Sequence, residues 1–407
     1  MSQKLTPLSY RKQIRVAKMR ILFVGMYPDP VSPYRNVFFQ NLIHAMADAG
    51  VECTVISPVP VTKYGAKIRK VPHKTEDFTE KKNRIQVFYP RYGSYSSRKI
   101  GKLHTGRWSE RSFQNSALRQ ARRLSSGFDL VYGHFLLSGG LAATRIAREL
   151  SLPAFFAYGE CDYVSEVTRH YGNIRPEELE GLRGIIAVST NNARTLQSKT
   201  LFQKYPILVA PNAVDMKLFR PMDKAECRAI LGLPMDRFIV GFVGGFIERK
   251  GDRRLLSAIN SLEHVYGAFA GRGDCPPEGE RVLFCRALEH REIPLLLNAV
   301  DVFCLPTRNE GSCNAIVEAA ACGVPIISSD LPFNDDLLTT QNSIRIDPDS
   351  VEEIQRAIQL LFSNAELRQS IATRVYQDAQ AFSIEERCKK ILLFLQNTLD
   401  QGADCHS

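Results

Sequence analysis

Short apolar runs alternate with amphipathic stretches along almost the whole chain, and this alternation limits the fold more than any other feature of the sequence. Residues 20–25 read RILFVG, which is typical of a buried strand that ends in glycine. Residues 36–49 carry apolar side chains at helical spacing, and Gly50 stands where a helix end prefers glycine. Residues 51–56, VECTVI, form the next strand-like run. A strand, a helix and a further strand in this order predict a parallel sheet with helices on both faces.

The same rhythm continues along the first half of the chain with one interruption. Residues 60–107 are polar, basic and rich in turn residues around one strand-like run at 85–89. We expect this segment to be a mobile or acceptor-facing loop region. The later strand-like runs of this half lie at 129–132, 154–157 and 184–188, and its helical stretches lie at 139–150 and from Thr190 onward.

A second set of units begins near Ile207 and predicts a second domain. Its strand-like runs lie at 237–243, 265–270, 281–284, 302–305, 325–328 and 343–346, and its helical stretches at 351–363 and 383–399. A length of 407 residues suits two domains of roughly 200 residues each. We therefore expect an α/β protein with two doubly wound Rossmann-like domains that face each other across a cleft. Ligands of such sheets bind outside the carboxyl ends of the strands, so the cleft is the expected site.

The expected domain boundaries follow from the cluster of prolines between residues 205 and 235. A basic N-terminal extension precedes the first strand, and a helical stretch closes the chain. The predicted parts are an extension at 1–19, an N-terminal domain at 20–205, a C-terminal domain at 206–382 and a final helix at 383–407.

Positive charge is concentrated in the first part of the chain. Residues 1–150 hold 26 lysines and arginines against 9 acidic residues, whereas residues 151–407 hold 27 against 34. A basic face of this kind is either a solvated surface or a site for an anionic membrane, a lipid-linked acceptor or another anionic substrate. Nucleic acid is a further option, but the chain has no recognition motif for it, and we expect no nucleic-acid partner.

The sequence also favours a cytoplasmic protein, placed at the inner face of the membrane if its basic half binds there. No apolar run reaches the roughly 18–20 residues of a spanning helix, and no secretory signal follows the basic N-terminus. The chain has ten cysteines but no C-x-x-C pair, so we expect reduced thiols and neither disulfides nor a zinc site.

Residues 305–328, LPTRNEGSCNAIVEAAACGVPIIS, carry the most informative motif. A strand ends at its start, a loop holds Glu310 and Gly311, and a helix opens near Cys313. The free N–H groups and positive dipole at a helix N-terminus suit a phosphate group, and Gly311 leaves room for a ligand. Glu310 lies beside this anion site, and Glu318 lies roughly two turns along the helix. Carboxylates in this place need hydroxyl donors, such as those of a sugar or ribose; otherwise Glu318 is a residue of the helix surface.

A second motif, VGGFIERKGD at 243–252, follows the first strand of the second set. Gly244 and Gly245 form a tight turn after that strand, as in many dinucleotide-binding folds. Arg249 and Lys250 stand just before the next helix, where their charges can neutralise a departing diphosphate. The alternative is an exposed basic loop.

Taken together, these segments resemble the family-four retaining GT-B glycosyltransferases. The resemblance rests on Glu310-x7-Glu318 with EAAACGVPIISSD, on VDVFCLPTRNEG upstream of it, on PNAVDMKLFRP at 211–221 and on FVGGFIERKG at 242–251. It extends over about residues 20–399 and is strongest over 205–350. The N-terminal YPDPVSPYRNVFF is similar to members that build bacterial cell-surface polysaccharides.

The resemblance implies that 20–205 is the acceptor-side domain, that 206–382 is the nucleotide-sugar donor domain and that the final helix crosses back to the N-terminal domain. It also implies a role for each matching residue. Glu318 would hold the donor ribose, Glu310 would bind hydroxyls of the transferred sugar, and Lys250 would contact the pyrophosphate. Backbone amides at Gly311 and Ser312 would support the same group. The expected reaction is metal-independent transfer of a hexose from a UDP- or GDP-sugar to a saccharide or lipid-linked acceptor, with retention of configuration and without a cofactor.

Two positions depart from the family pattern. Gly245 stands where the family commonly has arginine, so Arg249 or Arg272 is expected to supply the missing cation. Gly159 stands where the family often has histidine, which makes Glu160 a candidate for sugar or acceptor contact. His134, at the end of an earlier strand, is a further catalytic candidate and is otherwise a packed or capping residue.

Two other functions remain open on the same architecture. One is a nucleotide-sugar epimerase, which would release free epimerised sugar and form no glycoside. The other is an inactive nucleotide-sugar-binding protein, which the changes at Gly245 and Gly159 allow and which would bind donor without turnover.

Overall fold

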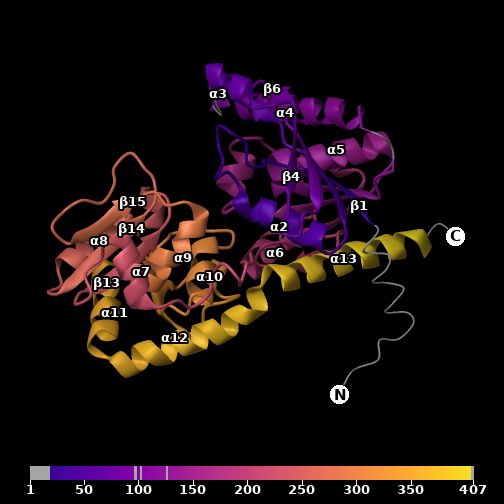
Figure 1. Cartoon of the computed structure of the whole chain (residues 1–407). Coiled ribbons are helices and arrows are strands. Elements are labelled where there is room, and N and C mark those ends of the chain that lie inside the picture. The colour runs from indigo at the N-terminus through magenta and orange to yellow at the C-terminus, as the bar shows by residue number, and fades with distance from the viewer. Residues whose placement is uncertain (1–18, 96–98, 101–102, 125–126, 405–407) are drawn as a thin grey trace. The chain divides into compact units, whose positions relative to one another are not determined.

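The computed structural model describes residues 19–95, 99–100, 103–124 and 127–404. Most of the basic extension expected at 1–19 therefore lies outside the described residues. The chain folds as two compact units, one made of residues up to Ala210 and from Arg387 onward, the other of Pro211–Glu386. Figure 1 labels their elements.

Unit 1 is built on an eight-stranded sheet in the order β12-β11-β10-β9-β1-β2-β5-β4. All neighbours pair in parallel except β4 and β5, which are antiparallel. The strands are β1 Arg20–Val24, β2 Glu52–Ile56, β4 Lys74–Phe78, β5 Arg84–Phe88, β9 Leu130–His134, β10 Ala154–Tyr158, β11 Leu182–Ala187 and β12 Ile207–Val209. Short pairs are formed by β3 Val59–Pro60 with β6 Arg91–Tyr92 and by β7 Lys99–Ile100 with β8 Leu103–His104.

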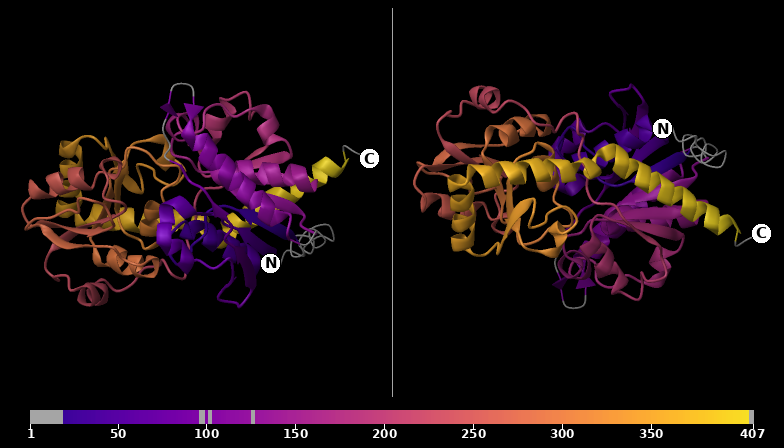
Figure 2. Two further views of the ribbon diagram at one scale, coloured as in Figure 1. Left: turned by 90° about the horizontal axis from the view of Figure 1, so that it is seen from above. Right: turned by 90° about the horizontal axis from the view of Figure 1, so that it is seen from below.

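Side-chain alternation along these strands separates two helical layers of unit 1. Leu22 and Val131 pack with α4 and α5, whereas Phe23 contacts Phe39 of α2 on the opposite face. Phe155 of that second face contacts Phe394 of α13, which lies along the sheet from Arg387 onward (Figure 2). The helices are α2 Val37–Asp48, α3 Val61–Tyr64, α4 Thr105–Ala121, α5 Leu141–Leu150, α6 Thr190–Gln197 and α13 Ile384–Asp404.

Unit 2 holds a six-stranded, fully parallel sheet in the order β15-β14-β13-β16-β17-β18. One apolar core joins this sheet to its helices. The strands are β13 Phe238–Val243, β14 Val265–Ala270, β15 Val282–Arg286, β16 Val302–Leu305, β17 Ile326–Ser329 and β18 Ser343–Ile346. The helices are α7 Lys224–Leu231, α8 Asp252–Asn260, α9 Ile293–Ala299, α10 Asn314–Ala321, α11 Val351–Ser363 and α12 Ala365–Ala379.

The α/β class and the two Rossmann-like halves are confirmed, but two local expectations were wrong. The segment 60–107 is not a plain loop region, because it contains β4 as an antiparallel edge strand and the short elements α3, β6, β7 and β8. Ile207–Val209 does not begin the second set of units, since it forms β12 and pairs with β11 at the edge of the first sheet.

Candidate active site

The centre of the candidate site is the loop that joins β16 to α10 in unit 2. Helix α10 begins at Asn314, and its N-cap residue Cys313 makes no side-chain capping hydrogen bond. Burial raises the pKa of the Cys313 thiol to about 12, although the charge of Lys250 lowers it. The Ile316 N–H donates to the Cys313 carbonyl at 3.2 Å, and the first turn of the helix has no side-chain cap next to Gly311 and Ser312. A helix end of this kind is a local structure that binds phosphate.

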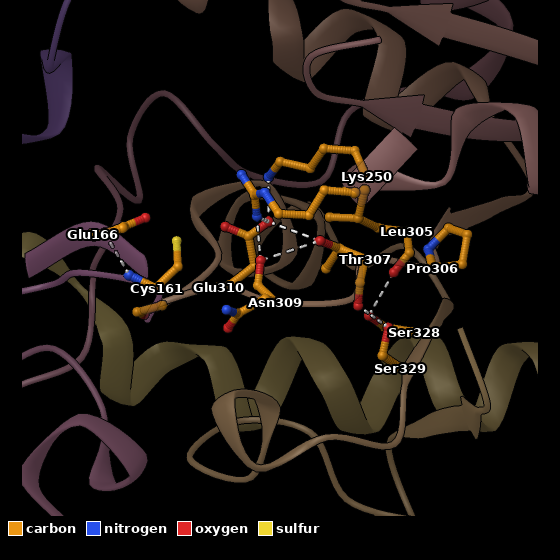
Figure 3. A network of polar contacts seen from close by, with 12 residues as sticks. Cys161, Glu166, Lys250, Leu305, Pro306, Thr307, Asn309, Glu310, Ser328 and Ser329 are labelled. Atoms are coloured by element: carbon orange, nitrogen blue, oxygen red, sulfur yellow. Dashed lines mark hydrogen bonds and ion pairs between the residues drawn. The ribbon is translucent and has the colours of Figure 1, made fainter. Parts of the chain in front are cut away.

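Glu310 is buried in this loop and is held by two cations. Its Oε1 lies 2.5 Å from Nζ of Lys250 and accepts a hydrogen bond of 3.0 Å from the Thr307 hydroxyl (Figure 3). The same oxygen lies 3.0 Å from Nη1 of Arg249. Arg249 also donates to the carbonyl of Asn309. In the described part of the chain the other carboxylate oxygen, Oε2, has no protein hydrogen bond, so it can accept one from a ligand hydroxyl.

Lys250 is placed for this contact by the turn before α8. It closes the short 3-10 helix Glu248–Lys250, and only 16% of its side chain is exposed. Burial lowers the pKa of Lys250, but the neighbouring Cys313 and Glu310 raise it by more, so the pKa is raised overall. Lys250 therefore stays charged and brings a fixed positive charge to the start of α10.

Glu318 is the second buried carboxylate of the motif and has a histidine partner. Its Oε1 lies 3.0 Å from Nε2 of His290, a residue of the short helix His290–Glu292, and the imidazole ring lies 5.2 Å from the ring of Phe219. Burial lowers the pKa of His290, but the hydrogen bond and charge of Glu318 outweigh burial and raise it overall. Glu318 is thus a fixed acceptor and not a residue of the open helix surface.

Two neighbouring turns come close together after β13 and β14, and glycines make this possible. A Cβ at Gly271 would lie 1.9 Å from the carbonyl oxygen of Gly244, so no side chain fits there. A Cβ at Gly245, by contrast, would meet no atom nearer than the carbonyl oxygen of Arg272 at 3.8 Å. That carbonyl accepts the N–H of Phe246 at 2.8 Å, which ties the two turns together. The position where the family has arginine is therefore open.

Two of the buried polar atoms that lack a partner among the described residues lie in the same region. The backbone and side-chain nitrogens of Asn212 donate to the hydroxyl and carbonyl oxygens of Ser312 at 3.1 and 3.0 Å. The Oδ1 atoms of Asn212 and Asn314 have no hydrogen-bond partner among the described residues. Buried polar atoms are nearly always paired, so their lack of partners next to α10 is a sign of a ligand or water site.

Glu160 of unit 1 holds a strained turn. Its Oε1 accepts the N–H groups of Leu136 and Leu137 at 2.6 and 3.2 Å, and its Oε2 accepts that of Gly159 at 3.1 Å. The turn after β9 contains Phe135 at φ 66°, a backbone conformation that large side chains rarely adopt. Burial raises the pKa of Glu160 to about 7 even though hydrogen bonds from its own N–H and from those of Leu137 and Leu136 lower it. The geometry gives Glu160 a positioning role, and contact with a sugar or acceptor stays a prediction.

His134 is the last residue of β9 and is packed among aromatic rings. Its ring stacks on Phe39 with the centroids 4.3 Å apart and the planes 24° apart. Burial and the charge of Arg387 lower the pKa of His134 to about 3, so the imidazole is neutral at physiological pH. Packing is the role that this geometry supports, and a catalytic role stays a prediction.

The structure thus brings most of the predicted donor residues together within unit 2. Glu310, Lys250 and Arg249 form one ion-paired cluster beside Gly311 and Ser312. Gly244 and Gly245 lie in the turn after β13, and Arg272 in the adjoining turn. Two residues were missed by sequence reasoning, namely His290, which holds Glu318, and Asn212, which holds Ser312.

Three structural features bear on other classes of site. Among the residues that the structure describes, no three His, Cys, Asp or Glu side chains gather as a metal site would require. The nine described cysteines are all free thiols. Within the same ranges, no helix is both long and apolar enough to cross a membrane.

Comparison with known proteins agrees with this fold. The model of the group 1 glycosyl transferases matches residues 237–364, which hold the α10 motif, and the model named Glycosyltransferase Family 4 matches residues 36–218. Two Rossmann-like units with a phosphate-type helix end in the second are the architecture that GT-B glycosyltransferases have. Since the two models together match more than half of the chain and fall on the two units in this order, the protein belongs to the family-four group of these enzymes.

Individual relatives are similar over long stretches. The chain is 25% identical over 376 residues to TuaC of Bacillus subtilis (strain 168), a glycosyltransferase named for teichuronic acid biosynthesis, with 89% of this chain and 94% of TuaC covered. It is 28% identical over 304 residues to a D-inositol 3-phosphate glycosyltransferase of Segniliparus rotundus, with 67% of each chain covered.

Solved structures share the fold at low sequence identity. Sucrose-phosphate synthase from Thermosynechococcus elongatus superposes with a TM-score of 0.74 at 18% identity, over 94% of this chain and 99% of the synthase. Anabaena HepE in complex with UDP and glucose superposes with a TM-score of 0.65 at 16% identity, over 93% of this chain and 100% of HepE.

Proposed function

We propose that the protein transfers a hexose from a nucleoside diphosphate sugar to a saccharide or lipid-linked acceptor, with retention of configuration and without a metal ion. The single observation that carries this proposal is the cluster at the start of α10, where an uncapped helix end, Lys250 and Arg249 surround the buried Glu310. Family membership supports the reaction class, which is glycosyl transfer. The cluster supports the binding of a diphosphate and the stabilisation of its charge as it leaves.

The cluster supports the binding of a donor diphosphate. The N–H groups of Gly311 and Ser312 and the dipole of α10 would face the phosphate oxygens. Lys250 and Arg249 share one oxygen of Glu310, so a diphosphate would compete with that carboxylate for them. HepE, which has the same fold, has been solved with UDP and with UDP-glucose, and we infer the same donor class here.

The same groups would act on the transition state. When the glycosidic bond to the diphosphate breaks, negative charge develops on the leaving oxygen, and a lysine, an arginine and a helix end stabilise it without a metal. The unpaired Oε2 of Glu310 would accept a hydrogen bond from a hydroxyl of the transferred sugar. The leaving diphosphate itself would take the acceptor proton, as the resemblance to retaining enzymes implies.

Glu318 would recognise the donor ribose. His290 occupies its Oε1, which leaves Oε2 as an acceptor for ribose hydroxyl donors. The Oδ1 atoms of Asn212 and Asn314, which have no partner among the described residues, lie at the start of α10 and are further hydrogen-bond acceptors for a ligand. Asn212 and Asn314 lie at the helix end on which the diphosphate is proposed to lie, and Glu318 lies one turn further along α10.

The acceptor is proposed from the similarity to TuaC. Over almost its whole length the chain resembles an enzyme named for the synthesis of teichuronic acid, a surface polysaccharide. Surface polysaccharide synthesis is therefore the pathway class that we propose. The basic first part of the chain suits an anionic saccharide or a lipid-linked acceptor.

A thermal-shift screen against UDP-, GDP- and ADP-sugars tests the donor proposal. A ligand present at 100 times its Kd stabilises a one-site protein by about 2.7 kcal/mol, which is readily measured as a rise in Tm. Glu318→Ala should abolish the shift of the best donor, and Glu366→Ala, on the exposed side of α12, should leave it unchanged. Glu310→Ala should mainly lower turnover, and EDTA should leave turnover intact. An undiminished shift in Glu318→Ala would contradict the assignment.

A further inference from the structure

Unit 1 contains a cavity whose lining is rich in arginine and which the donor chemistry does not use. It has a volume of about 370 Å³ and lies between α4, α5 and the short helix Pro176–Leu179. Its charged lining consists of Arg111, Arg145, Arg148, Arg175, Glu177 and Glu178. Figure 1 shows α4 and α5 side by side on one layer of the unit.

The positive charge of this cavity is only partly compensated by the protein. Glu178 pairs with Arg107 at 3.2 Å and with Arg175 at 3.5 Å, and Glu180 pairs with Arg148 at 3.3 Å. Among the described residues, Arg111 and Arg145 have neither an ion pair nor a side-chain hydrogen bond. Burial lowers the pKa of Arg145, and the charges of Arg148, Arg111 and Arg122 lower it further, while the charge of Glu149 raises it by less. Guanidinium groups that repel one another around a cavity are stabilised when an anion enters.

An exposed stripe of one tryptophan, two arginines and one asparagine on α4 adjoins the cavity. Trp108, Arg111, Asn115 and Arg119 follow one another at helical spacing along one side of α4, and Trp108 is 51% exposed. The ring of Tyr95, itself 53% exposed, meets Trp108 edge-on at 6.5 Å. These residues line a second hollow of about 460 Å³, and this hollow shares Arg111 and Asn115 with the first.

The combination of arginines with exposed tryptophan and tyrosine matches the interface of a charged bilayer. Aromatic rings with one polar atom prefer the headgroup level, and basic side chains are attracted by anionic lipids. We propose that this face of unit 1 binds the phosphate headgroup of an anionic membrane lipid. Arg111 and Arg145 bind the phosphate, and Trp108 and Tyr95 enter the headgroup layer. This binding does not depend on the proposed donor site.

Tryptophan fluorescence tests this proposal directly, because Trp108 is the single tryptophan of the chain. Vesicles of phosphatidylcholine with 30% phosphatidylglycerol should shift its emission to the blue and protect it from acrylamide, whereas pure phosphatidylcholine should do neither. Each arginine near such a surface contributes about fivefold in affinity, so Arg111→Gln with Arg145→Gln should weaken vesicle binding about 30-fold.

Matched variants separate this site from general charge effects. Arg183→Gln with Arg194→Gln removes the same charge from exposed positions outside both hollows and should keep wild-type binding. Arg119→Gln, on the stripe itself, should lose about fivefold. Because Arg111 and Arg145 make no ion pair or side-chain hydrogen bond among the described residues, their variant should keep a Tm close to that of the wild type.

Several results would overturn the proposal. One is equal binding to neutral and anionic vesicles, and another is an equal loss in the two arginine pairs. Saturation of the cavity by inorganic phosphate without vesicle binding would assign it to a soluble ligand, and a stronger Trp108 response to duplex RNA would assign the face to nucleic acid. Glu318→Ala should bind vesicles normally, so loss of donor binding and loss of membrane binding are distinguishable.

Discussion

Replacing Lys250 by methionine separates a structural role of the lysine from a role in donor binding. The methionine keeps most of the apolar stem but removes the charge that lies 2.5 Å from Glu310. The side chains of the pair are only 16% and 10% exposed, so water screens the pair weakly. Glu310 would remain buried with Arg249 and the Thr307 hydroxyl as its partners.

The expected magnitudes follow from this geometry. Breaking a buried ion pair by removing one partner costs about 3–5 kcal/mol, and the partners that Glu310 retains reduce this to about 2 kcal/mol. A hydrogen bond from a charged group to a phosphate contributes about 1.5–3 kcal/mol, so the Kd for the nucleotide should rise about 10- to 100-fold. Urea unfolding gives the first quantity, and titration calorimetry with the nucleoside diphosphate gives the second.

The double variant Lys250→Met with Glu310→Gln separates the effect of Lys250 on stability from its effect on nucleotide affinity. It removes both charges, so the free energy of unfolding should return to within about 1 kcal/mol of the wild type, while nucleotide affinity should stay weak. Arg308→Met, on an exposed arginine that pairs with Glu248 and Asp349, is the matched control and should leave affinity unchanged. Wild-type affinity in Lys250→Met, or recovery of affinity in the double variant, would refute the role of Lys250 in donor binding.

Three further predictions test neighbouring parts of the structure. Since the pKa of His290 is raised in the folded state, the stability advantage of the wild type over His290→Gln should be complete below its ordinary value of about 6.5 and decline as pH rises through the raised value, as urea unfolding would show. Gly245→Arg should fold normally and bind nucleotide more tightly in calorimetry, whereas Gly271→Ala should lower the Tm because its Cβ meets the Gly244 carbonyl. Glu160→Ala should cost about 3 kcal/mol in unfolding free energy by leaving three backbone N–H groups unpaired, with nucleotide affinity unchanged.

The strands that the sequence predicts well are the buried ones. The runs at 20–25 and 51–56 contain the observed strands β1 and β2, because parallel strands covered on both faces are continuously apolar. The sequence of β4, KTEDF, lacks this signal because it is an edge strand with mostly exposed side chains. Partners of edge strands also depend on tertiary structure, which is why Ile207–Val209 could not be assigned to its sheet from sequence.

Helix α4 shows a second limit of the sequence. Its apolar contacts are made by Phe113, Ala117, Leu118 and Ala121, but buried Glu110 and Gln114 interrupt the pattern. The carboxylate of Glu110 accepts the backbone N–H of Ser138 at 2.6 Å, a contact between segments 28 residues apart. Burial of a charged residue against a distant turn leaves no periodic signal, so the helix was not expected.

In the candidate site, too, contacts within one local motif could be predicted from the sequence, whereas contacts between distant segments could not. Glu310, Gly311 and Glu318 belong to one local motif, so their proximity could be predicted from spacing along one loop and helix. His290 precedes Glu318 by 28 residues and Asn212 precedes Ser312 by 100, and neither pairing has a local signature. The segment PNAVD, which holds Asn212, was a visible signal for the family but not for this contact.

A crystal structure of the protein with its nucleoside diphosphate sugar is the measurement that bears most directly on the donor assignment. We expect the diphosphate oxygens within hydrogen-bonding distance of the Gly311 and Ser312 amides and of Nζ of Lys250, and the ribose hydroxyls on Oε2 of Glu318. A nucleotide bound elsewhere, with Lys250 still paired to Glu310 and Glu318 facing solvent, would contradict the account.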